Sequence, residues 1–507
     1  MKRSRLLLVL SLVALVGSAP GRPAVAAGSF TFFGSGYGHG VGMSQYGALG
    51  MAQNGSGYKQ ILTQFFTGTT VEQHTLPGSL RVGLFQGEKL LHLHARNGPV
   101  ELHLGSADGT LIGTIPRDGR WNVRTGSGHF RILDGRTLVG GHGWGGPKKP
   151  LIATYADGAM VQLKESGGIS YNRGYVEFNI YSSNNRGRAI AVVGPQEYLY
   201  GLGEVPSSWP PQAMMAQAVA ARTYAFEIAK RTGQHQSWCN CAVTDDTRNQ
   251  VYVAWAKDGG TDGDRWVQAV DRTKGEVVLY QGNLVQAYFG SSSGGYTENN
   301  ENVWNGTPIP YLRGVCDPGD YTADNPNRVW RKEMTSSAVT GALASYTGNI
   351  GTVRRFIDIR RGVSGRIISL TVVGSSGRRS ISGYQLKSGI GLLETKVWIN
   401  SNRNVTGAIR AKYDGINCRA KLPTTRQQSV AGGRLQRFAN GQIFFKKAAG
   451  AHWLKGPVLD YYLSHGGPGG SLGFPTSDVS VDTDGRMSAT FQGGKVVCPV
   501  SGSCSQT

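Results

Sequence analysis

One segment of the chain predicts its own local structure more strongly than any other: a lone glutamate on a tight loop, followed by a strong helix start. Residues 204–225 read E-V-P-S-S-W-P-P-Q-A-M-M-A-Q-A-V-A-A-R-T-Y-A. Ser207 or Ser208 can cap the helix, and the next two prolines are preset for its first turn. The alanine-rich run that follows predicts a helix over about residues 210–230, ending at Gly233.

The loop that carries Glu204 suits a general acid. Its carboxyl is held at the entry of a rigid helix, flanked by the apolar side chains of Val205, Trp209 and Tyr200. These aromatic rings would raise the pKa of the carboxyl by desolvation, whereas the helix N-terminus and Arg222 would lower it, and the sequence leaves that balance open. In the structural alternative, Glu204 only interacts with the helix N-terminus, which is worth up to about 1 kcal/mol.

The N-terminus predicts export. Lys2, Arg3 and Arg5 precede an apolar run over residues 6–16, and A-V-A at 24–26 is a small-residue cleavage pattern. We therefore expect a signal peptide over residues 1–26. No later segment approaches the ~18 apolar residues of a membrane span, so we expect a secreted chain without one.

Six cysteines in an exported chain favour disulfides. They are Cys239, Cys241, Cys316, Cys418, Cys498 and Cys504. Fifteen pairings are open, with Cys498–Cys504 the best local pair. C-x-C is short for an internal bridge, so we expect Cys239 or Cys241 to reach Cys316. A metal held by this motif and His235 is the weaker alternative, because zinc usually takes C-x-x-C and a second ligand pair, and we expect neither a metal nor another cofactor.

Composition and patterning predict an α+β fold rich in strands. The 507 residues suffice for two or three domains, and 75 glycines with only 17% charged residues favour turns and strands. Within residues 80–200, short apolar segments typical of strands alternate with glycine and asparagine turns. Two further strands are predicted after the helix, at residues 276–280 and 284–289. The earlier strands are L-R-V-G-L-F, P-V-E-L-H-L, F-R-I-L, Y-V-E-F-N-I-Y and A-I-A-V-V, within residues 80–200.

The formal net charge is +21, which indicates anionic surroundings. The basic residues are spread along the chain, without a Lys/Arg block or a nucleic-acid-binding motif, so we expect no nucleic acid partner. Outside the cell the available polyanions are the phosphate polymers and peptide carboxylates of a bacterial wall, which a basic surface would attract.

Several long motifs, in order, carry a family resemblance. They are the run Y-L-Y-G-L-G-E followed by the helix, N-Q-V-Y at 249–252, A-V-D-R-T-K-G-E-V-V at 269–278, and S-S-S-G-G-Y-T-E-N-N-E-N-V-W at 291–304. Over residues 78–400 the chain resembles the sporulation stage II protein D family (SpoIID/LytB). The resemblance implies a lytic transglycosylase that cleaves peptidoglycan glycan strands, or a non-catalytic enhancer of a cell-wall amidase.

The resemblance also implies the site. Glu204 would be catalytic, and the substrate contacts would lie at His39, Ser44, Gln45, Tyr200, Gln217, Arg222, Ser292, Ser293, Gly294 and Glu298. Arg222 has an equal structural alternative as an ion pair, and Tyr224 is expected in the core. Trp238, Trp255 and Trp304 could stack on the faces of sugars, although tryptophan usually packs in the core first.

One motif occupies a different position along this chain than in typical members of the family. G-S-G-Y-G-H-G-V-G-M-S-Q-Y-G-A, which closes the domain in typical members, here occupies residues 34–48. The chain is therefore expected to be circularly permuted, with residues 27–72 completing a catalytic domain over residues 73–405. This order predicts that the segment packs beside the chain near residue 400 and brings His39 to the Glu204 cleft.

A single carboxyl matches one of the two glycan-cleaving chemistries. Retaining and inverting hydrolases use two carboxylates, about 5 to 9.5 Å apart. A lytic transglycosylase can use one, which first protonates the glycosidic oxygen and then deprotonates the sugar's 6-hydroxyl, so that a 1,6-anhydro ring closes. The sequence supplies one candidate of this kind, Glu204.

The tail over residues 410–507 is expected to be a separate β-rich unit. R-F-A-N-G-Q-I-F-F, with Phe438, and T-F-Q-G-G-K-V-V, with Phe491, flank G-G-P-G-G-S-L-G-F-P-T-S-D at 466–478. This pattern is similar to the LGFP repeat, which implies binding to wall polymer. Since a single repeat rarely buries its own apolar face, the fragments must pair or lean on the main domain.

Overall fold

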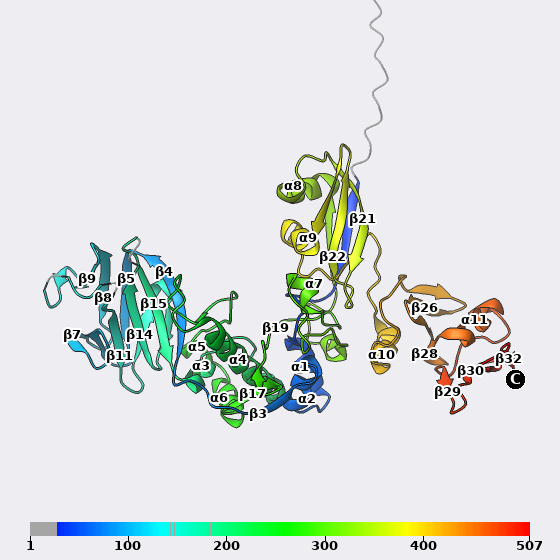
Figure 1. Cartoon of the computed structure of the whole chain (residues 1–507), viewed down its shortest axis with the longest axis horizontal. Coiled ribbons are helices and arrows are strands. Elements are labelled where there is room, and N and C mark those ends of the chain that lie inside the picture. Colours follow the sequence, from blue (N-terminus) through cyan, green and yellow to red (C-terminus); the bar gives the residue numbers. More distant parts are fainter. Residues whose placement is uncertain (1–27, 142, 147, 182–183) are drawn as a thin grey trace, which may run out of the picture.

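The computed structural model describes residues 28–141, 143–146, 148–181 and 184–507, so the predicted signal peptide lies outside the described residues. Helices and strands are mixed, as the predicted α+β class requires. Figure 1 shows an elongated chain with a β body on the left, helices at the centre, an upright unit above them and a tail on the right. Within the described ranges, every helix is too short or too polar to cross a bilayer.

The β body consists of two sheets of mostly antiparallel strands. The apolar side chains of both sheets belong to one hydrophobic core. In β5, for example, every second side chain is buried, which is the pattern of a strand with one face on the core. All five strands predicted within residues 80–200 are confirmed. The strands are β4 (Leu80–Glu88), β5 (Leu90–Arg96), β6 (Val100–Leu104), β7 (Thr110–Ile115), β8 (Arg120–Gly126), β9 (His129–Asp134), β10 (Thr137–Leu138), β11 (Leu151–Tyr155), β12 (Met160–Leu163), β13 (Ile169–Tyr171), β14 (Tyr175–Ile180) and β15 (Gly187–Val193).

The central region is built around α4 (Pro211–Thr232), which is buried along almost all of its length. Its predicted extent is confirmed, with Gly233 as C-cap, but the predicted serine cap is wrong. The N-cap is Pro210, without a side-chain cap, and its carbonyl already accepts from Ala213 and Met214. The other elements are β2 (Met43–Ser44), α1 (Gln45–Gln53), α2 (Tyr58–Phe65), β3 (Thr70–Gln73), α3 (Pro195–Tyr200), β16 (Val243–Thr244), α5 (Trp255–Asp258), α6 (Gly263–Arg272), β17 (Glu276–Tyr280), β18 (Asn283–Leu284), β19 (Phe289–Gly290) and α7 (Asn300–Trp304).

The prediction of one continuous strand over residues 284–289 is wrong, because only its two ends lie in strands, β18 and β19. β18 pairs with β17, whereas β19 leaves that sheet and pairs in parallel with β2 of the N-terminal segment. The four residues between them change partners, so they cannot stay in one ladder. This crossing ties the chain after the helix to residues 43–44.

The upright unit has its own core and contains the first described strand. β1 (Ser29–Gly34) lies between β20 (Trp330–Thr335) and β24 (Val397–Ile399). The displaced N-terminal segment therefore does pack beside the chain near residue 400. The unit is completed by α8 (Ser336–Thr347), β21 (Val353–Arg361), β22 (Ile367–Gly374), β23 (Arg378–Ser382) and α9 (Gly383–Ile390).

The tail folds as two small four-stranded sheets. Phe438 and Phe491, the two predicted equivalents, each close a bridge to a proline, Pro423 and Pro475. One apolar cluster joins the two sheets, and a second joins the first sheet to α10. The elements are α10 (Gly407–Gly415), β25 (Gln428–Val430), β26 (Gly433–Phe438), β27 (Gly441–Lys446), β28 (Gly450–Leu454), α11 (Gly456–Ser464), β29 (Ser480–Val481), β30 (Met487–Phe491), β31 (Gly494–Cys498) and β32 (Ser505–Gln506).

The six cysteines form three disulfides, and one prediction about them is wrong. Cys239 pairs with Cys241, Cys316 with Cys418, and Cys498 with Cys504, the last as predicted. The short C-x-C bridge closes because Asn240 between the two adopts a left-handed conformation, with φ of 55°, and brings the two Cα atoms to 5.1 Å.

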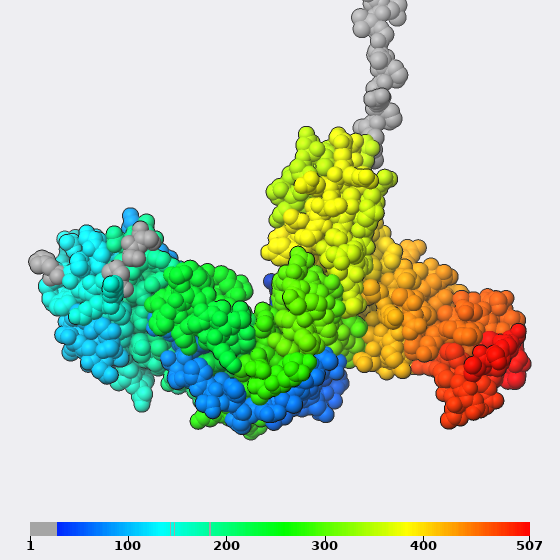
Figure 2. Space-filling model, viewed as in Figure 1, coloured from blue at the N-terminus to red at the C-terminus, as the bar shows by residue number. Residues whose placement is uncertain are grey.

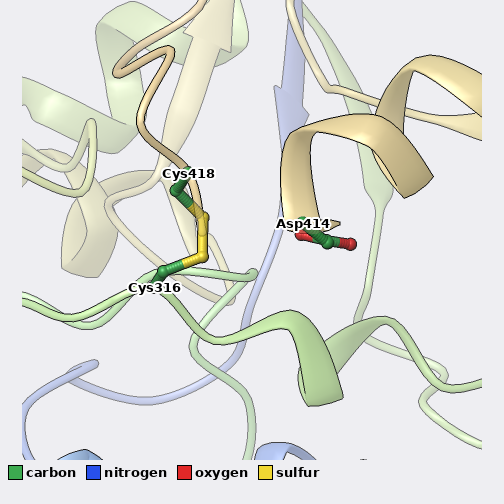
Figure 3. A group of neighbouring side chains, drawn as sticks. All are labelled: Cys316, Asp414 and Cys418. Atoms are coloured by element: carbon green, nitrogen blue, oxygen red, sulfur yellow. A yellow bond between two sulfur atoms is a disulfide. The ribbon is translucent and has the colours of Figure 1, made fainter. Parts of the chain in front are cut away.

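Cys316–Cys418 links the central region to the segment after α10, beside Asp414 (Figure 3). Asp414 lies close enough to both sulfur atoms to suggest a metal site on distance alone. The disulfide uses both sulfurs, and Arg410 donates to the carboxylate, at 2.7 Å. These three residues therefore have no free thiolate to offer a metal.

Candidate functional site

Glu204 lies on the loop between α3 and α4, half-buried, with its carboxylate held on two sides. The backbone N–H of Val251 donates to Oε1 at 2.7 Å. The amide of Gln45, the first residue of α1, lies 3.4 Å from Oε2 and 3.3 Å from the carbonyl oxygen of Glu204. Two segments far apart in the sequence thus orient one carboxyl.

Burial raises the pKa of the Glu204 carboxyl, and the hydrogen bonds from Val251 and Gln45 offset part of that rise. The sequence left open whether the pKa of Glu204 is raised or lowered, and in the structure the effect of desolvation is the larger. Arg222 does not touch the carboxylate, and among the described residues no other carboxylate contributes to the shift. A carboxyl of this kind holds its proton closer to neutral pH than a free glutamate does.

The displaced segment reaches Glu204 through Gln45, whereas the predicted contact through His39 is not made. The Nδ1 atom of His39 accepts from the N–H of Val41 at 3.1 Å, and Nε2 lies 3.0 Å from the carbonyl oxygen of Phe289. Burial lowers the pKa of His39 to about 4, so the ring is neutral and its tautomer is set by these two bonds. His39 ties its loop to β19.

The other predicted residues of the helical region divide in two. Gln217 is buried beside Gln45, with its Oε1 3.4 Å from the Gln45 amide, and so lies one contact from Glu204. Arg222 is fully buried and donates to the backbone carbonyls of Glu276 and Val270 inside the core. These bonds support its structural role, and its contact with substrate stays a prediction. Tyr200 is half-buried and donates to Asp271 at 2.6 Å.

The side chains of the S-S-S-G-G loop also point into the protein, and the predicted contact of this loop with glycan stays a prediction. Ser292 and Ser293 are 2% and 1% exposed, and their hydroxyls donate to Asp320 and Asp317. The hydroxyl of Ser44 donates to the same Asp320 at 3.0 Å. The buried carboxyl groups of Asp317 and Asp320 need hydrogen-bond donors, and the three serines supply them. These bonds hold the loop against the start of α1.

Glu298 and Gly294, in the same stretch of chain as these serines, also bond to other parts of the protein. The Glu298 carboxylate is 0% exposed and accepts from the hydroxyl of Ser364 at 2.6 Å and from backbone N–H groups. The carbonyl of Gly294 accepts from Lys396 at 2.7 Å. Both residues anchor the loop to the upright unit.

The three tryptophans keep exposed faces, and one of them lines a cavity. Trp238, Trp255 and Trp304 are 41%, 39% and 43% exposed. The Trp304 ring packs on Tyr288 and His39, with centroids 4.6 and 5.2 Å apart. With His39 it lines a cavity of about 360 Å³. Tyr224, predicted as core, is confirmed as buried.

One titratable group near the site was missed. Asp245 follows β16, and burial together with the neighbouring carboxylate of Asp246 raises its pKa to about 7. Its charge and that of Glu204 both act on the buried Tyr198. The segment T-D-D-T-R-N-Q-V-Y carries two adjacent acids before the N-Q-V-Y motif, and this pairing is the signal that could have drawn attention to it.

The sequence around the site was compared with known protein families. Residues 183–280, which include Glu204 and α4, match the family model for SpoIID, described as stage II sporulation protein, and residues 422–470 match the LGFP repeat. The chain thus contains one region that matches the SpoIID family model and a second that matches the LGFP repeat. The SpoIID match ends at Tyr280, so the N-terminal segment that supplies Gln45 lies outside it.

Curated relatives of the SpoIID domain agree with this result. An uncharacterised protein of Brachyspira hyodysenteriae is 30% identical over 210 residues, 40% of this chain and 52% of its own length. The amidase enhancer of Bacillus subtilis is 39% identical over 117 residues, 23% of this chain and 14% of its own. Stage II sporulation protein D of Bacillus amyloliquefaciens is 31% identical over 172 residues, 32% of this chain and 47% of its own. The chain thus spans about half or less of these relatives' lengths.

Proposed function

We propose that this chain is a secreted, wall-associated lytic transglycosylase that cleaves peptidoglycan glycan strands with Glu204 as its single acid and base. The observation that carries the proposal is the Glu204 carboxyl itself: half-buried, raised in pKa by burial, and held by Val251 and Gln45 without a second carboxylate in contact. A pair of carboxylates would instead favour hydrolysis.

The proposed reaction proceeds in two proton transfers. The Glu204 carboxyl donates its proton to the glycosidic oxygen as the bond from C1 of the muramyl sugar breaks. The resulting carboxylate takes the proton of that sugar's 6-hydroxyl as its oxygen bonds to C1. The products are a 1,6-anhydro end and a free 4-hydroxyl, Glu204 is protonated again, and no water is consumed.

The LGFP repeat supports a wall-bound protein. In this proposal residues 410–507 hold wall polymer while the SpoIID domain cuts the glycan, with no cofactor required. The match to the LGFP repeat is the observation that supports this location.

The decisive experiment is incubation of the purified protein with isolated glycan strands, followed by mass analysis for 1,6-anhydro ends. We expect Glu204→Gln to keep the fold and to lower cleavage by about 10²- to 10⁴-fold, because an amide cannot donate an acidic proton. Glu72→Gln, an exposed glutamate on β3, is the matched control. Undiminished cleavage by the Glu204→Gln protein would remove this residue from the mechanism.

A second candidate function rests on one relative. The match with a protein named amidase enhancer, at 39% identity, favours a non-catalytic protein that binds glycan and activates a cell-wall amidase. In that case the parent and the Glu204→Gln protein would both stimulate a purified amidase equally, and neither would produce anhydro ends. The same two proteins therefore separate the two functions.

A further inference from the structure

A basic, uncovered face lies on the sheet β21–β22–β23 of the upright unit. Helices α8 and α9 pack against one side of this sheet, and the buried Leu370 and Val372 of β22 point into the core between them. Because successive side chains on a strand alternate between faces, Ser369, Thr371 and Val373 lie on the opposite face.

The register places arginines on this opposite face. Arg355 and Arg378 pair across Val373, one from each neighbouring strand, and Arg360 pairs with Ser369. All three arginines are exposed. We call this set of three the arginine face. It presents three guanidinium groups, two from β21 and one from β23, the two strands that flank β22. The spacing of about 4.8 Å between adjacent strands keeps these groups within reach of one extended chain.

Hydroxyl groups fill the positions between the arginines. Thr371 and Ser380 form a cross-strand pair, 3.1 Å apart, and Ser382 pairs with Ser369. A depression of about 580 Å³ lies over Thr371, Ser380 and Arg378. Guanidinium and hydroxyl donors side by side are the groups that bind phosphate oxygens.

The charge of the face is not neutralised by its surroundings. Arg354 of β21 and Arg379 of β23 are also exposed, and Arg379 lines the depression. Asp358 is the one acidic side chain that lines the depression, and in the described part of the chain none of these five arginines forms an ion pair, unlike Arg331 on the neighbouring β20. Unpaired arginines on an open sheet attract polyanions through space and lose that attraction with salt.

We propose that the arginine face binds an anionic polymer with repeated phosphodiester groups, such as a phosphate-containing wall polymer, and so gives the protein a second wall contact apart from its tail. The face offers no exposed aromatic ring among its named residues on which nucleobases could stack, which favours a phosphodiester chain without bases over single-stranded nucleic acid. The inference is independent of the cleavage chemistry.

The test is binding of full-length protein to synthetic poly(glycerol phosphate), measured by calorimetry over a range of salt concentrations. We expect R355Q/R360Q/R378Q to weaken binding about tenfold or more and to reduce the slope of log affinity against log salt by about 2, near 0.7 for each lost contact. The matched control is R120Q/R124Q/R131Q, which removes three exposed arginines from β8 and β9 of the β body. We expect this control to change affinity by less than threefold.

Three outcomes would overturn the proposal: no binding by the parent, equal losses in both triple variants, or tighter binding to oligothymidylate of equal phosphate number. Thermal midpoints verify that both variants fold. Cleavage of soluble glycan strands, measured in parallel, reports on the proposed activity separately, so that the two proposals fail independently.

Discussion

The protonation state of Glu204 depends on a residue that lies 159 positions away in the chain. Gln45 donates to the carboxylate, and a donor to the charged form lowers a pKa. It does so from the first turn of α1, where the hydroxyl of Ser44 caps the helix by accepting from Gly47. The position of α1 therefore sets how far burial can raise the pKa of Glu204.

We expect Gln45→Met to raise the pKa of Glu204 further, since a hydrogen bond that favours the charged carboxylate is lost. A general acid works in its protonated form, so the alkaline limb of the pH profile of kcat/KM should move to higher pH. Gln53→Met, on the exposed end of the same helix, is the control. An unchanged profile would show that Gln45 does not tune the acid.

Of the predicted site residues, the structure places Gln45 and Gln217 beside Glu204 but joins others to partners inside the protein. Glu204 could be identified because a rigid helix start follows it directly. His39, Ser292 and Glu298 also stand in motifs rich in small residues, but their partners come from distant segments: Phe289, Asp320 and Ser364. In a sequence, a polar residue that binds substrate cannot be distinguished from one that bonds to another part of the protein. The distinction requires the hydrogen-bond partners, which only the folded structure supplies.

Among the elements, α1, the S-S-S-G-G loop and the turn over residues 317–320 meet around two buried carboxyl groups. Asp317 and Asp320 are both buried there. Gly47 of α1 is required, because a Cβ at this position would lie 2.4 Å from the Asp317 carboxylate. Burial, with the Asp320 charge second, raises the pKa of Asp317 to about 7.

This shift predicts a pH-dependent stability. An unfolded aspartate has a pKa near 3.9, so between about pH 4 and 7 the unfolded chain releases a proton that folded Asp317 keeps. The free energy of unfolding therefore falls as the pH rises through this window. We expect Asp317→Asn to reduce that fall by up to about 1.4 kcal/mol per pH unit.

Urea unfolding at several pH values measures this effect. Asp324→Asn, an exposed neighbour that accepts from Gln53, is the control. Parallel curves for the parent and the Asp317→Asn protein would contradict a protonated Asp317 in the folded state.

Elements with a local pattern were predictable, and those that depend on a change of partner were not. The β-body strands and α4 follow from alternation and from helix signals within a single segment. Residues 284–289 have the composition of one strand, but their two ends bond to different neighbours. The C-x-C disulfide likewise depends on the backbone of Asn240, whose left-handed conformation no spacing rule supplies.

For the molecule as a whole, the disulfide Cys316–Cys418 decides where the tail can be separated. A chain that ends at Lys421 keeps this bridge and loses both LGFP-type sheets. We expect it to cleave soluble glycan fragments at the parent rate and to bind insoluble wall about tenfold or more weakly, since one of several linked contacts is lost.

Co-sedimentation with purified wall measures this loss, and a thiol assay verifies the intact bridge. The cut uncovers Tyr413 and Ile409 of α10, which pack on Trp453, so the thermal midpoint of the remainder must also be compared. Equal sedimentation of the full and shortened proteins would exclude an anchoring role for the tail.

The position of β1 has a consequence for how the chain reaches this fold. The side chains of Thr31 and Glu333 meet across β1 and β20, although they are 302 residues apart in the chain. A ribosome delivers the N-terminus first, so this strand emerges early and has no partner until most of the sequence has followed. During that interval two unpaired strand edges and the phenylalanines of β1 stay open to other chains. Pairing over such a separation is slow, so the upright unit closes only after its distant strands have met.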